Sequence, residues 1–340
     1  MKLNGADFVI IGENIHTTRM VLRNGKLVVT APGGSEAVRY VSAAGETRFL
    51  PIPEAFKRTQ DYGEGRIKHV KIAIHDAMAG GFEGLEYLRA LVGRQSAAGA
   101  GADFLDLNVD EVSLRPAEQI DAMRWLVETI QSMTDIPVAV DSSNLETIVA
   151  GLDAARGRAL LNSASLERIG ALEIAASRGI PVVVTAAGEK GMPQDDLERV
   201  ANASRMVDAA LELGIAKSDL YVDALVFPIS VDSQFGIHCF DAIRALRAKY
   251  GPEIHITGGL SNVSFGLPCR RVINDVFINL AVAAGADSGI VDPVATDVRR
   301  VFTLDKQARP YQLAEDMLLG RDRNCKSFLR AYRKGELGVA

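Results

Sequence analysis

Short apolar runs alternate with longer amphipathic segments along the chain from residue 103 onward. The runs are rich in Val, Ile and Leu without regular polar alternation, which is typical of strands buried on both faces of a parallel sheet. They read FLDLNV, PVAVDSS, ALLNSA, PVVVTAA, LYVDALV, IHITGGL and SGIVDP. The segments between them repeat apolar residues three and four positions apart. This spacing predicts helices over 116–133, 144–156, 166–179, 195–214, 235–251 and 268–285.

The N-terminal run DFVIIGENI supplies one more strand, and the segment after Val294 one more helix. Eight strand–helix units in this order predict an α/β fold, a (β/α)8 TIM barrel, as a single domain over 1–340. A doubly wound open sheet is the competing architecture. It favours a glycine-rich phosphate turn after the first strand, and the sequence there, GENIHTT, is not one.

Residues 17–66 interrupt this pattern between the first strand and its helix, which is expected to begin near Ile67. The segment MVLRNGKLVVT carries Asn24-Gly25 between apolar arms, a strong hairpin signal, and AVRYVSAAGETRFLPIP predicts a second hairpin. Loops after barrel strands open on the catalytic face, so this insertion is placed to form a lid, a substrate wall or a partner-docking surface. A tolerated decoration is the alternative. A helical tail is expected over 305–340.

The composition is that of a globular protein, with 340 residues, a net charge of −5 and 48% hydrophobic residues. Enough apolar material is present to exclude a disordered chain, and no apolar run reaches the roughly 20 residues of a membrane span. The start MKLNGADFVIIGE predicts no signal peptide. The odd set of 3 cysteines favours free thiols and a cytoplasmic location, and the acidic balance argues against nucleic acid as a partner.

Polar side chains recur where the predicted strands end, and in a barrel such positions point into one mouth. Carboxylates and carboxamides there are costly if buried without partners, so they must form a network, bind a ligand, or both. A structural hydrogen bond or a helix cap is the alternative for any one of them. The residues are Glu13, Asn14, Asp106, Asn108, Asp141, Ser142, Ser143, Asn162, Ser163, Thr185, Asp223, Ser261, Asn262 and Asp292.

This residue set matches a flat heterocycle better than a metal ion. The 5 histidines show no paired ligand spacing, so no metal site is predicted. Neither a nucleophile elbow nor a GxxxxGK[ST] loop occurs. A carboxylate accepts paired N–H bonds from an amidine-like ring edge, and a carboxamide both donates and accepts. A pterin presents such an edge.

Five motifs, in order, resemble the pterin-binding methyltransferases. The motifs are LDLNVD, VAVDSSNLETIVAGL, ALLNSASLE, LYVDALVFP and GLSNVSFGLPCRRVIN, with GENIH before them. The resemblance is to the methyltetrahydrofolate:corrinoid methyltransferases and the pterin module of cobalamin-dependent methionine synthase, within the dihydropteroate-synthase-like barrels. It covers GENIH and most of 67–300, but neither the insertion nor the tail.

By position, the resemblance implies that Asp141, Asn162 and Asp223 hold the pterin ring, with Asp106 and Asn108 at the floor of the pocket. Asn262 matches the family's asparagine that hydrogen-bonds the methyl-bearing pterin nitrogen. The remaining folate-site positions it implies are Arg270, Glu13 and Ser264. The family has a polar amide where this chain has Phe265.

The reaction that this resemblance implies is methyl transfer between a folate nitrogen and the cobalt of a corrinoid. A tertiary amine is a poor leaving group, so the nitrogen needs a proton or a strengthening hydrogen bond. Asn262 can supply that hydrogen bond. Because a carboxamide does not titrate, the proton is expected to pass through water, with Asp106 or Asp223 tuning the network.

A corrin-binding DxHxxG motif does not occur, so cobalamin is expected on a separate corrinoid protein. The direction of transfer stays open, and the resemblance implies a homodimer. Dihydropteroate synthase is one alternative, although its strand-seven motif carries a lysine and GGLSNVS has none. A non-catalytic subunit that binds folate or the corrinoid protein is the other.

Overall fold

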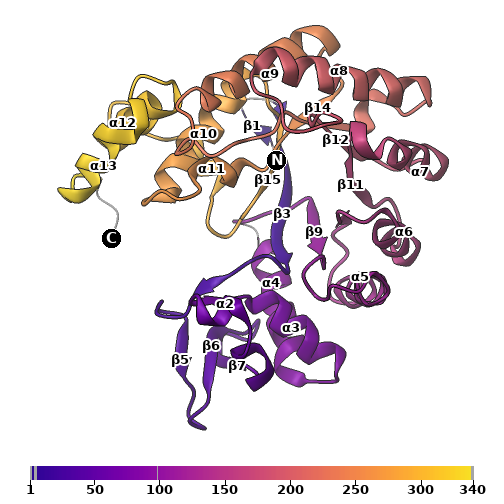
Figure 1. Ribbon diagram of the computed structural model, residues 1–340, viewed down its shortest axis with the longest axis vertical. Helices are drawn as coiled ribbons and strands as arrows, with labels where there is room; N and C mark the ends of the chain where they lie inside the picture. The colour runs from indigo at the N-terminus through magenta and orange to yellow at the C-terminus, as the bar shows by residue number, and fades with distance from the viewer. Residues whose placement is uncertain (1, 4–5, 98, 338–340) are drawn as a thin grey trace. The chain divides into compact units, whose positions relative to one another are not determined.

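The computed structural model describes residues 2–3, 6–97 and 99–337. Within them, eight parallel strands form one sheet in the order β14-β13-β12-β11-β10-β9-β3-β15 (Figure 1). This is the strand order of an α/β TIM barrel, so the predicted fold class is confirmed. The strands are β3 (Val9–His16), β9 (Phe104–Asn108), β10 (Val138–Asp141), β11 (Leu160–Ala164), β12 (Val182–Thr185), β13 (Leu220–Asp223), β14 (His255–Thr257) and β15 (Ser288–Val291).

Helices follow these strands along the chain, close to the ranges that the apolar spacing predicts. They are α3 (His69–Met78), α4 (Phe82–Ser96), α5 (Pro116–Gln131), α6 (Leu145–Ala154), α7 (Gly170–Arg178), α8 (Asp196–Glu212), α9 (Phe235–Tyr250), α10 (Arg270–Ala284) and α11 (Val298–Val301). Short 3-10 turns η1 (Leu166–Arg168), η2 (Lys217–Asp219) and η3 (Leu260–Ser264) lie between them.

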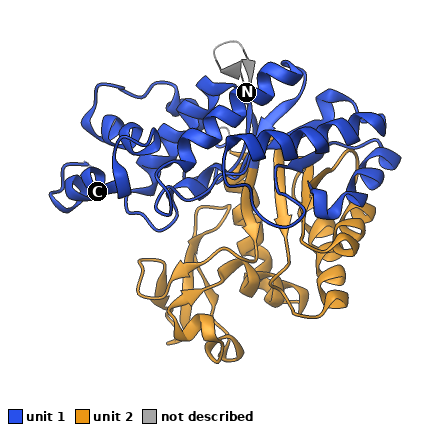
Figure 2. Cartoon of the chain, turned by 45° about the horizontal axis from the view of Figure 1, so that its top comes forward, with its two compact units in different colours: residues 1–11, 99–101, 163–340 blue, residues 12–98, 102–162 orange. Residues whose placement is uncertain are grey.

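The chain forms two compact units (Figure 2). Unit 1 comprises residues 1–11, 99–101 and 163–340, and unit 2 comprises residues 12–98 and 102–162. The single-domain organisation expected from the sequence stays a prediction. In both units the strands are covered on both faces: every residue of β11 and of β12 is buried. Burying one Leu, Ile or Val side chain contributes about 1.5–3 kcal/mol, so these strands are a main source of stability.

The insertion after β3 builds a small antiparallel sheet within unit 2. Its strands β5 (Val28–Thr30), β6 (Glu36–Val41) and β7 (Thr47–Pro51) pair in the order β5-β6-β7. The sheet lies beside α4 (Figure 1), where the Tyr40 ring meets Tyr87 edge-on with centroids 4.8 Å apart. The Tyr40 hydroxyl donates to Glu83 over 2.9 Å, and Arg48 pairs with the same carboxylate. The insertion is therefore anchored to the helix layer. Two short helices, α1 (Glu54–Lys57) and α2 (Gln60–Gly63), complete it.

Of the two predicted hairpins, the second is confirmed and the first is wrong. β6 and β7 pair antiparallel with Val41 opposite Thr47. The arms around Asn24-Gly25 do not pair with each other, although Gly25 N–H does donate to the Leu22 carbonyl in a turn. Instead β4 (Val21–Leu22) pairs with β8 (Arg66–Ile67), and β5 pairs with β6. Each arm thus pairs with a strand other than its neighbour along the chain, so tertiary pairing overrides the local turn signal.

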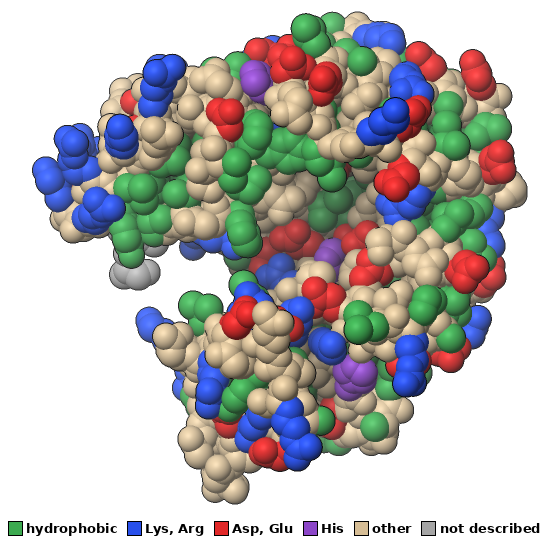
Figure 3. Space-filling view, in the orientation of Figure 1, with side chains coloured by type: hydrophobic (Ala, Val, Ile, Leu, Met, Phe, Trp, Pro, Cys, Tyr) green, Lys and Arg blue, Asp and Glu red, His purple; other side chains and the backbone are tan. Residues whose placement is uncertain are grey.

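The tail consists of α12 (Arg309–Leu318), η4 (Arg323–Cys325) and α13 (Lys326–Arg333) within unit 1. The Tyr311 hydroxyl donates to Asn279 Oδ1 over 3.1 Å and so fastens α12 to α10. Lys and Arg side chains gather over these C-terminal helices (Figure 3), among them Lys326, Arg330 and Arg333.

No helix in the described part of the chain is both long enough and apolar enough to cross a membrane.

Candidate active site

Three of the predicted site residues stand in one row across adjacent strands of unit 2. Asp141 at the end of β10 is in register with Asn108 on β9 and with Asn162 on β11. Because parallel strands carry in-register side chains on the same face, the three groups are neighbours. Asn108 Nδ2 donates to Asp141 Oδ2 over 3.0 Å. The row is therefore a connected edge of one carboxyl group flanked by two carboxamides.

The amide of Asn108 is held in one orientation by its other contacts. Its Oδ1 accepts from the Thr17 hydroxyl over 3.3 Å and from the Asp110 N–H over 3.0 Å. With the oxygen taken by two donors, the Nδ2 group must be the side that faces Asp141. Thr17, the first residue of the insertion, thus helps to build the row.

Asp106 lies two residues before Asn108 on β9 and shares its face, as the alternation of a strand requires. It is fully buried. Asn162 Nδ2 lies 3.3 and 3.2 Å from its two carboxylate oxygens. His16 Nε2 lies 3.0 Å from Oδ2. Asp106, which the resemblance places at the floor of the pocket, is therefore contacted by two other side chains of the site.

His16 is the site residue that sequence reasoning missed. It is the last residue of β3, so its position at a strand end was the available signal; spacing between histidines could not reveal it. Burial lowers the pKa of His16, but the charge and hydrogen bond of Asp106 outweigh it and raise the pKa to about 9. His16 is then an imidazolium at neutral pH that donates to Asp106.

Among the described residues, one group of side chains has the geometry of a possible cation site, and it belongs to this same network. His16, Asp106 and Asp141 each bring a ligand atom within 4.8 Å of the others. In the structure the His16 imidazole and the Asp106 carboxylate are joined by a hydrogen bond, so we describe this group as a hydrogen-bonded acid–base network.

Burial raises the pKa of Asp141 to about 7, with the charge of Asp106 adding to the effect. His16 and the hydrogen bond from Asn108 act in the opposite direction. The pKa of Asp141 is therefore raised well above that of a surface carboxylate, which makes this residue a candidate for a ligand site. Glu13 lies close enough for its charge to act on His16, and it pairs with Arg19 at 3.6 Å.

Unit 1 contributes a second set of predicted residues, led by Asp223 at the end of β13. Its Oδ1 accepts the Leu225 N–H over 2.8 Å. Burial raises its pKa to about 6, while the Leu225 N–H and the positive charge of Arg199 act to lower it. A Cβ on Gly258 would come within 3.3 Å of Oδ1, so the glycine after β14 leaves the room that this carboxyl group occupies.

Asn262 is exposed on η3, directly after the Gly258–Gly259 pair. A Cβ on Gly259 would lie only 2.7 Å from Asn262 Nδ2, so this glycine is needed for the amide to lie where it does. Asp223 and Asn262 therefore both border the same glycine pair. The sequence predicted both residues as members of one site.

Arg270 and Ser264 support the turn that carries Asn262. Arg270 Nε donates to Ser264 Oγ over 2.9 Å, and its Nη2 donates to the Ser261 carbonyl over 2.8 Å. Within unit 1 these two predicted folate-site residues thus hold η3 together. Phe265, where the resembled family has a polar amide, is 59% exposed.

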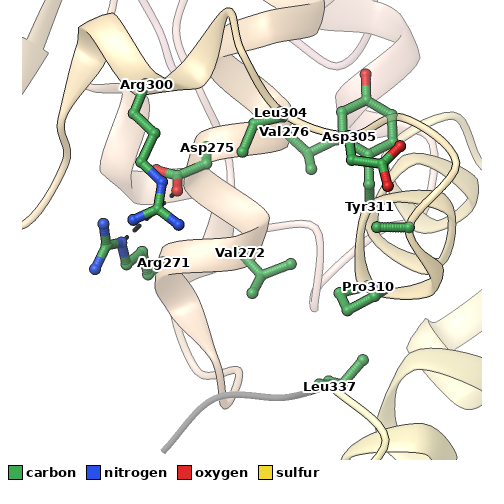
Figure 4. Close-up of a pocket in the computed structure, with 11 residues that line it drawn as sticks. Arg271, Val272, Asp275, Val276, Arg300, Leu304, Asp305, Pro310, Tyr311 and Leu337 are labelled. Atoms are coloured by element: carbon green, nitrogen blue, oxygen red, sulfur yellow. Dashed lines mark ion pairs between the residues drawn. The ribbon is translucent and has the colours of Figure 1, made fainter.

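A separate cavity of about 280 Å³ lies within unit 1 (Figure 4). Its walls come from α10, α12 and the segment 300–308 rather than from strand ends. Arg271 Nε approaches Asp275 Oδ2 at 3.8 Å there, and Tyr311 and Pro310 form the opposite wall. This cavity contains none of the predicted site residues.

The sequence pattern of the family described as "Pterin binding enzyme" matches residues 76–292. Among curated proteins, the chain is 28% identical over 246 residues to a methylcorrinoid:tetrahydrofolate methyltransferase of Eubacterium limosum, which covers 71% of this chain and 86% of that protein. It is 31% identical over 238 residues to the methionine synthase of Mycobacterium leprae, covering 66% of this chain but only 19% of the synthase.

Solved structures with a similar fold include dihydropteroate synthases. That of Stenotrophomonas maltophilia aligns with a TM-score of 0.52 at 21% identity, over 65% of this chain and 86% of the synthase. That of Xanthomonas albilineans aligns with a TM-score of 0.51 at 23% identity, over 65% of this chain and 83% of the synthase. At these identities the likeness concerns the fold.

Proposed function

Because this chain belongs to the family of pterin-binding enzymes, as its motifs predicted, we propose that it transfers a methyl group between a corrinoid and tetrahydrofolate. The folate is the substrate bound by the chain's own residues. The corrinoid is a second substrate, carried by a separate corrinoid protein. The relative from Eubacterium limosum, most of whose length this chain covers, supports the assignment by its name.

The observation that carries the proposal is the row of Asn108, Asp141 and Asn162 across three adjacent strands. A reduced pterin offers a ring N–H and an amino group on one edge. An ionised Asp141 accepts both, and the flanking carboxamides meet the donors and acceptors on either side. The connected hydrogen bonds of unit 2 hold these side chains in place before any ligand binds. This reduces the free-energy cost of ordering the side chains on binding.

Asp223 and Asn262 are the proposed residues of unit 1 that act on the folate. Asp223 is a buried carboxyl group that accepts a ring or amino N–H when it is ionised. Asn262 is proposed to hydrogen-bond the pterin nitrogen that gains or loses the methyl group. This interaction strengthens as the charge on that nitrogen changes, and such transition-state stabilisation raises the rate rather than the affinity.

We propose that the working direction is from methylcorrinoid to tetrahydrofolate, and the name of the Eubacterium limosum relative, a methylcorrinoid:tetrahydrofolate methyltransferase, supports this direction. The pterin nitrogen attacks the methyl carbon, and the cobalt–carbon bond breaks with both electrons left on cobalt. The nitrogen then bears a methyl group and one proton too many, which must leave. Asp223, whose pKa is about 6, is suited to take that proton through water near neutral pH.

Asp106 has a different part in this proposal. Its carboxylate is held by the His16 imidazolium and by Asn162, so it fixes the pocket floor and the orientation of the Asn162 amide. It tunes the network through these hydrogen bonds, which hold the His16 ring and the Asn162 amide in place.

The insertion is proposed to meet the corrinoid protein. It starts directly after His16, the last residue of β3, just as Asn108 and Asp141 are the last residues of β9 and β10. Exposed apolar side chains lie along it, and Leu22, Leu27 and Val41 are the clearest examples. Apolar groups of this kind are enriched at the centres of protein interfaces.

Anaerobic spectroscopy tests the function directly. Purified protein mixed with methylcobalamin and tetrahydrofolate should produce the Co(I) band, and the reverse mixture with methyltetrahydrofolate should consume it. The faster mixture identifies the working direction. Tight folate binding with no change in either cobalt spectrum, even with a corrinoid protein as donor, would contradict methyl transfer and favour a non-catalytic folate-binding role.

Dihydropteroate synthesis is tested in the same preparation. Condensation of 4-aminobenzoate with a pterin pyrophosphate would favour that reaction. The motif GGLSNVS lacks the lysine that the synthase resemblance would need, so we expect no condensation.

A further inference from the structure

Arg199 on α8 is fully buried, which is unusual for an arginine, and it binds the turn that follows Asp223. Its Nε donates to the Ala224 carbonyl over 3.1 Å and reaches the Leu225 carbonyl at 3.4 Å. Its Nη1 donates to the Asp195 carbonyl over 3.0 Å. One side chain thus ties the turn after β13 to the start of α8, all within unit 1.

The turn itself is strained at Leu225, which has a φ of 60°. Left-handed backbone is unfavourable for a branched side chain and persists only where the surroundings hold it. The Leu225 N–H is the group that donates to Asp223 Oδ1, over 2.8 Å. The strained conformation therefore aims a backbone donor at the carboxyl group, and Arg199 holds the carbonyls on that same stretch.

Fold stability alone does not account for this arginine. Its Nη2 is buried and has no hydrogen-bond partner among the described residues. Its guanidinium lies 4.6 Å from the centre of the Phe227 ring, a contact that a long apolar side chain could also make. Burying the charged guanidinium with its Nη2 group unpaired costs free energy. We therefore expect a role that needs both the positive charge of Arg199 and its several hydrogen-bond donors.

We propose that Arg199 is a positioning residue for Asp223: it holds the turn that orients the carboxyl group and keeps that group ionised for the folate. This inference rests on the proposed function, since it gives Asp223 a ligand to meet. Arg199 does not itself need to touch the substrate. Its effect passes through the Ala224 and Leu225 carbonyls and through its charge.

The charged and titratable groups around the pair are consistent with this role. Cys239 on α9 faces both side chains, and burial raises its pKa to about 12, so it stays a neutral thiol. Asp195 and Asp196 face Arg199 and support its charge. Burial raises the pKa of Asp223 and Arg199 opposes that rise, so removing Arg199 should raise the pKa further.

Two substitutions separate the charge from the shape. Arg199→Met removes both, and Arg199→Lys keeps the charge but cannot bridge several carbonyls. Arg247→Met is a matched control. Arg247 is also a helix arginine that binds loop carbonyls, with its Nε 3.0 Å from the Gly285 oxygen and its Nη1 2.7 Å from the Ile254 oxygen. It lies at the other end of the strands, before β14, and should affect only stability.

The first measurement is the titration of Asp223 by carbon NMR of carboxyl-labelled aspartate, assigned with Asp223→Asn. Arg199→Met should raise the apparent pKa by roughly one unit or more, and Arg247→Met should leave it unchanged. An unshifted titration in Arg199→Met would overturn the proposal. This experiment contains neither folate nor corrinoid, so its outcome is independent of whether methyl transfer occurs.

The second measurement is steady-state methyl transfer. Arg199→Lys should raise the KM for folate on the order of tenfold, because a displaced Asp223 binds the folate less well, and should also lower kcat, because Asp223 takes the proton in the proposed reaction. If Arg199→Met fails to fold, the Arg199→Lys variant still tests whether Arg199 positions Asp223. A KM within twofold of the wild type, in a folded Arg199→Lys protein, would assign the arginine a purely structural role.

Discussion

The partly buried His16 and the fully buried Asp106 form an ion pair within unit 2, with Nε2 and Oδ2 3.0 Å apart. The pair joins the first barrel strand of the chain to the second, and one ligand atom of each of its residues lies within 4.8 Å of Asp141. It connects the acid–base state of the pocket to the stability of the fold, because the carboxylate and the imidazolium each stabilise the other's charge.

Replacing His16 with Gln should lower stability in a pH-dependent way. The pKa of His16 is raised from 6.5 to about 9, so its contribution is complete below pH 6.5 and is lost as the pH rises through 9. We expect a difference in unfolding free energy on the order of 2–3 kcal/mol at pH 6 that shrinks towards pH 9.5. Urea unfolding followed by the fluorescence of Trp125, the single tryptophan, measures it.

His75→Gln is the control for that experiment. The His75 ring contacts a backbone oxygen, that of Val112 at 2.9 Å, and not a buried carboxylate. The pH dependence of its stability difference from the wild type is the baseline against which that of His16→Gln is compared. Equal pH dependence in the two variants would contradict a His16–Asp106 ion pair.

Asp141 should govern folate affinity near neutral pH. Its pKa is about 7, and the ionised form is the one that accepts two N–H groups, so affinity should fall roughly tenfold from pH 8 to pH 6. Asp141→Asn should bind weakly and with little pH dependence. Quenching of Trp125 fluorescence or calorimetry gives the affinities, with the exposed Asp121→Asn as a control that keeps the wild-type profile.

The Asp141→Asn variant should be more heat-stable than the wild type at pH 8. An acid whose pKa is raised on folding opposes folding wherever the pH exceeds its unfolded value, and this penalty grows from about pH 4 up to pH 7. The difference in melting temperature should therefore disappear towards pH 4. A less stable Asp141→Asn protein at pH 8 would show that the carboxyl group has a structural task instead.

Asn262→Ala should slow single-turnover methyl transfer by on the order of 10²–10³, the usual cost of removing one transition-state hydrogen-bond donor. Folate affinity should change by only a few-fold, because the strengthened hydrogen bond exists in the transition state. Asn262 is exposed on η3, so the melting temperature should not change. A rate loss below about threefold would remove Asn262 from the mechanism.

Negative charges introduced on the insertion should weaken binding of the corrinoid protein without slowing the methyl transfer itself. A Leu22→Glu, Leu27→Glu, Val41→Glu variant changes three exposed side chains that are 59%, 46% and 51% accessible. We expect at least tenfold weaker use of a corrinoid protein that the wild type accepts, and unchanged transfer with free methylcobalamin. Leu213→Glu, at an exposed position on unit 1, is the control. Equal loss with both methyl donors would place the effect in the active site.

The barrel could be predicted from the sequence because its signals are local. The run FLDLNV predicted β9 and the apolar spacing over 116–133 predicted α5, since each pattern arises from the geometry of a single element. Strand ends could be predicted too, and with them Asp106, Asn108, Asp141 and Asn162 as neighbours.

The partners of the site residues depended on the tertiary structure. His16 reaches Asp106 across 90 positions of sequence, and Arg199 reaches the Ala224 and Leu225 carbonyls across 25 and 26. No local pattern encodes such contacts. The insertion shows the same limit, since the Asn24-Gly25 signal specified a turn but β8, far along the chain, decided which strand would pair with β4.

The sequence by itself therefore determined the order of elements, the strand-end residues and the family, all of which follow from short-range periodicity and motif order. The tertiary structure decided which carboxyl groups are buried, which cations face them and hence how they titrate. The physical reason is that a pKa depends on solvent exclusion and on charges a few ångströms away, and both arise only when distant segments pack together.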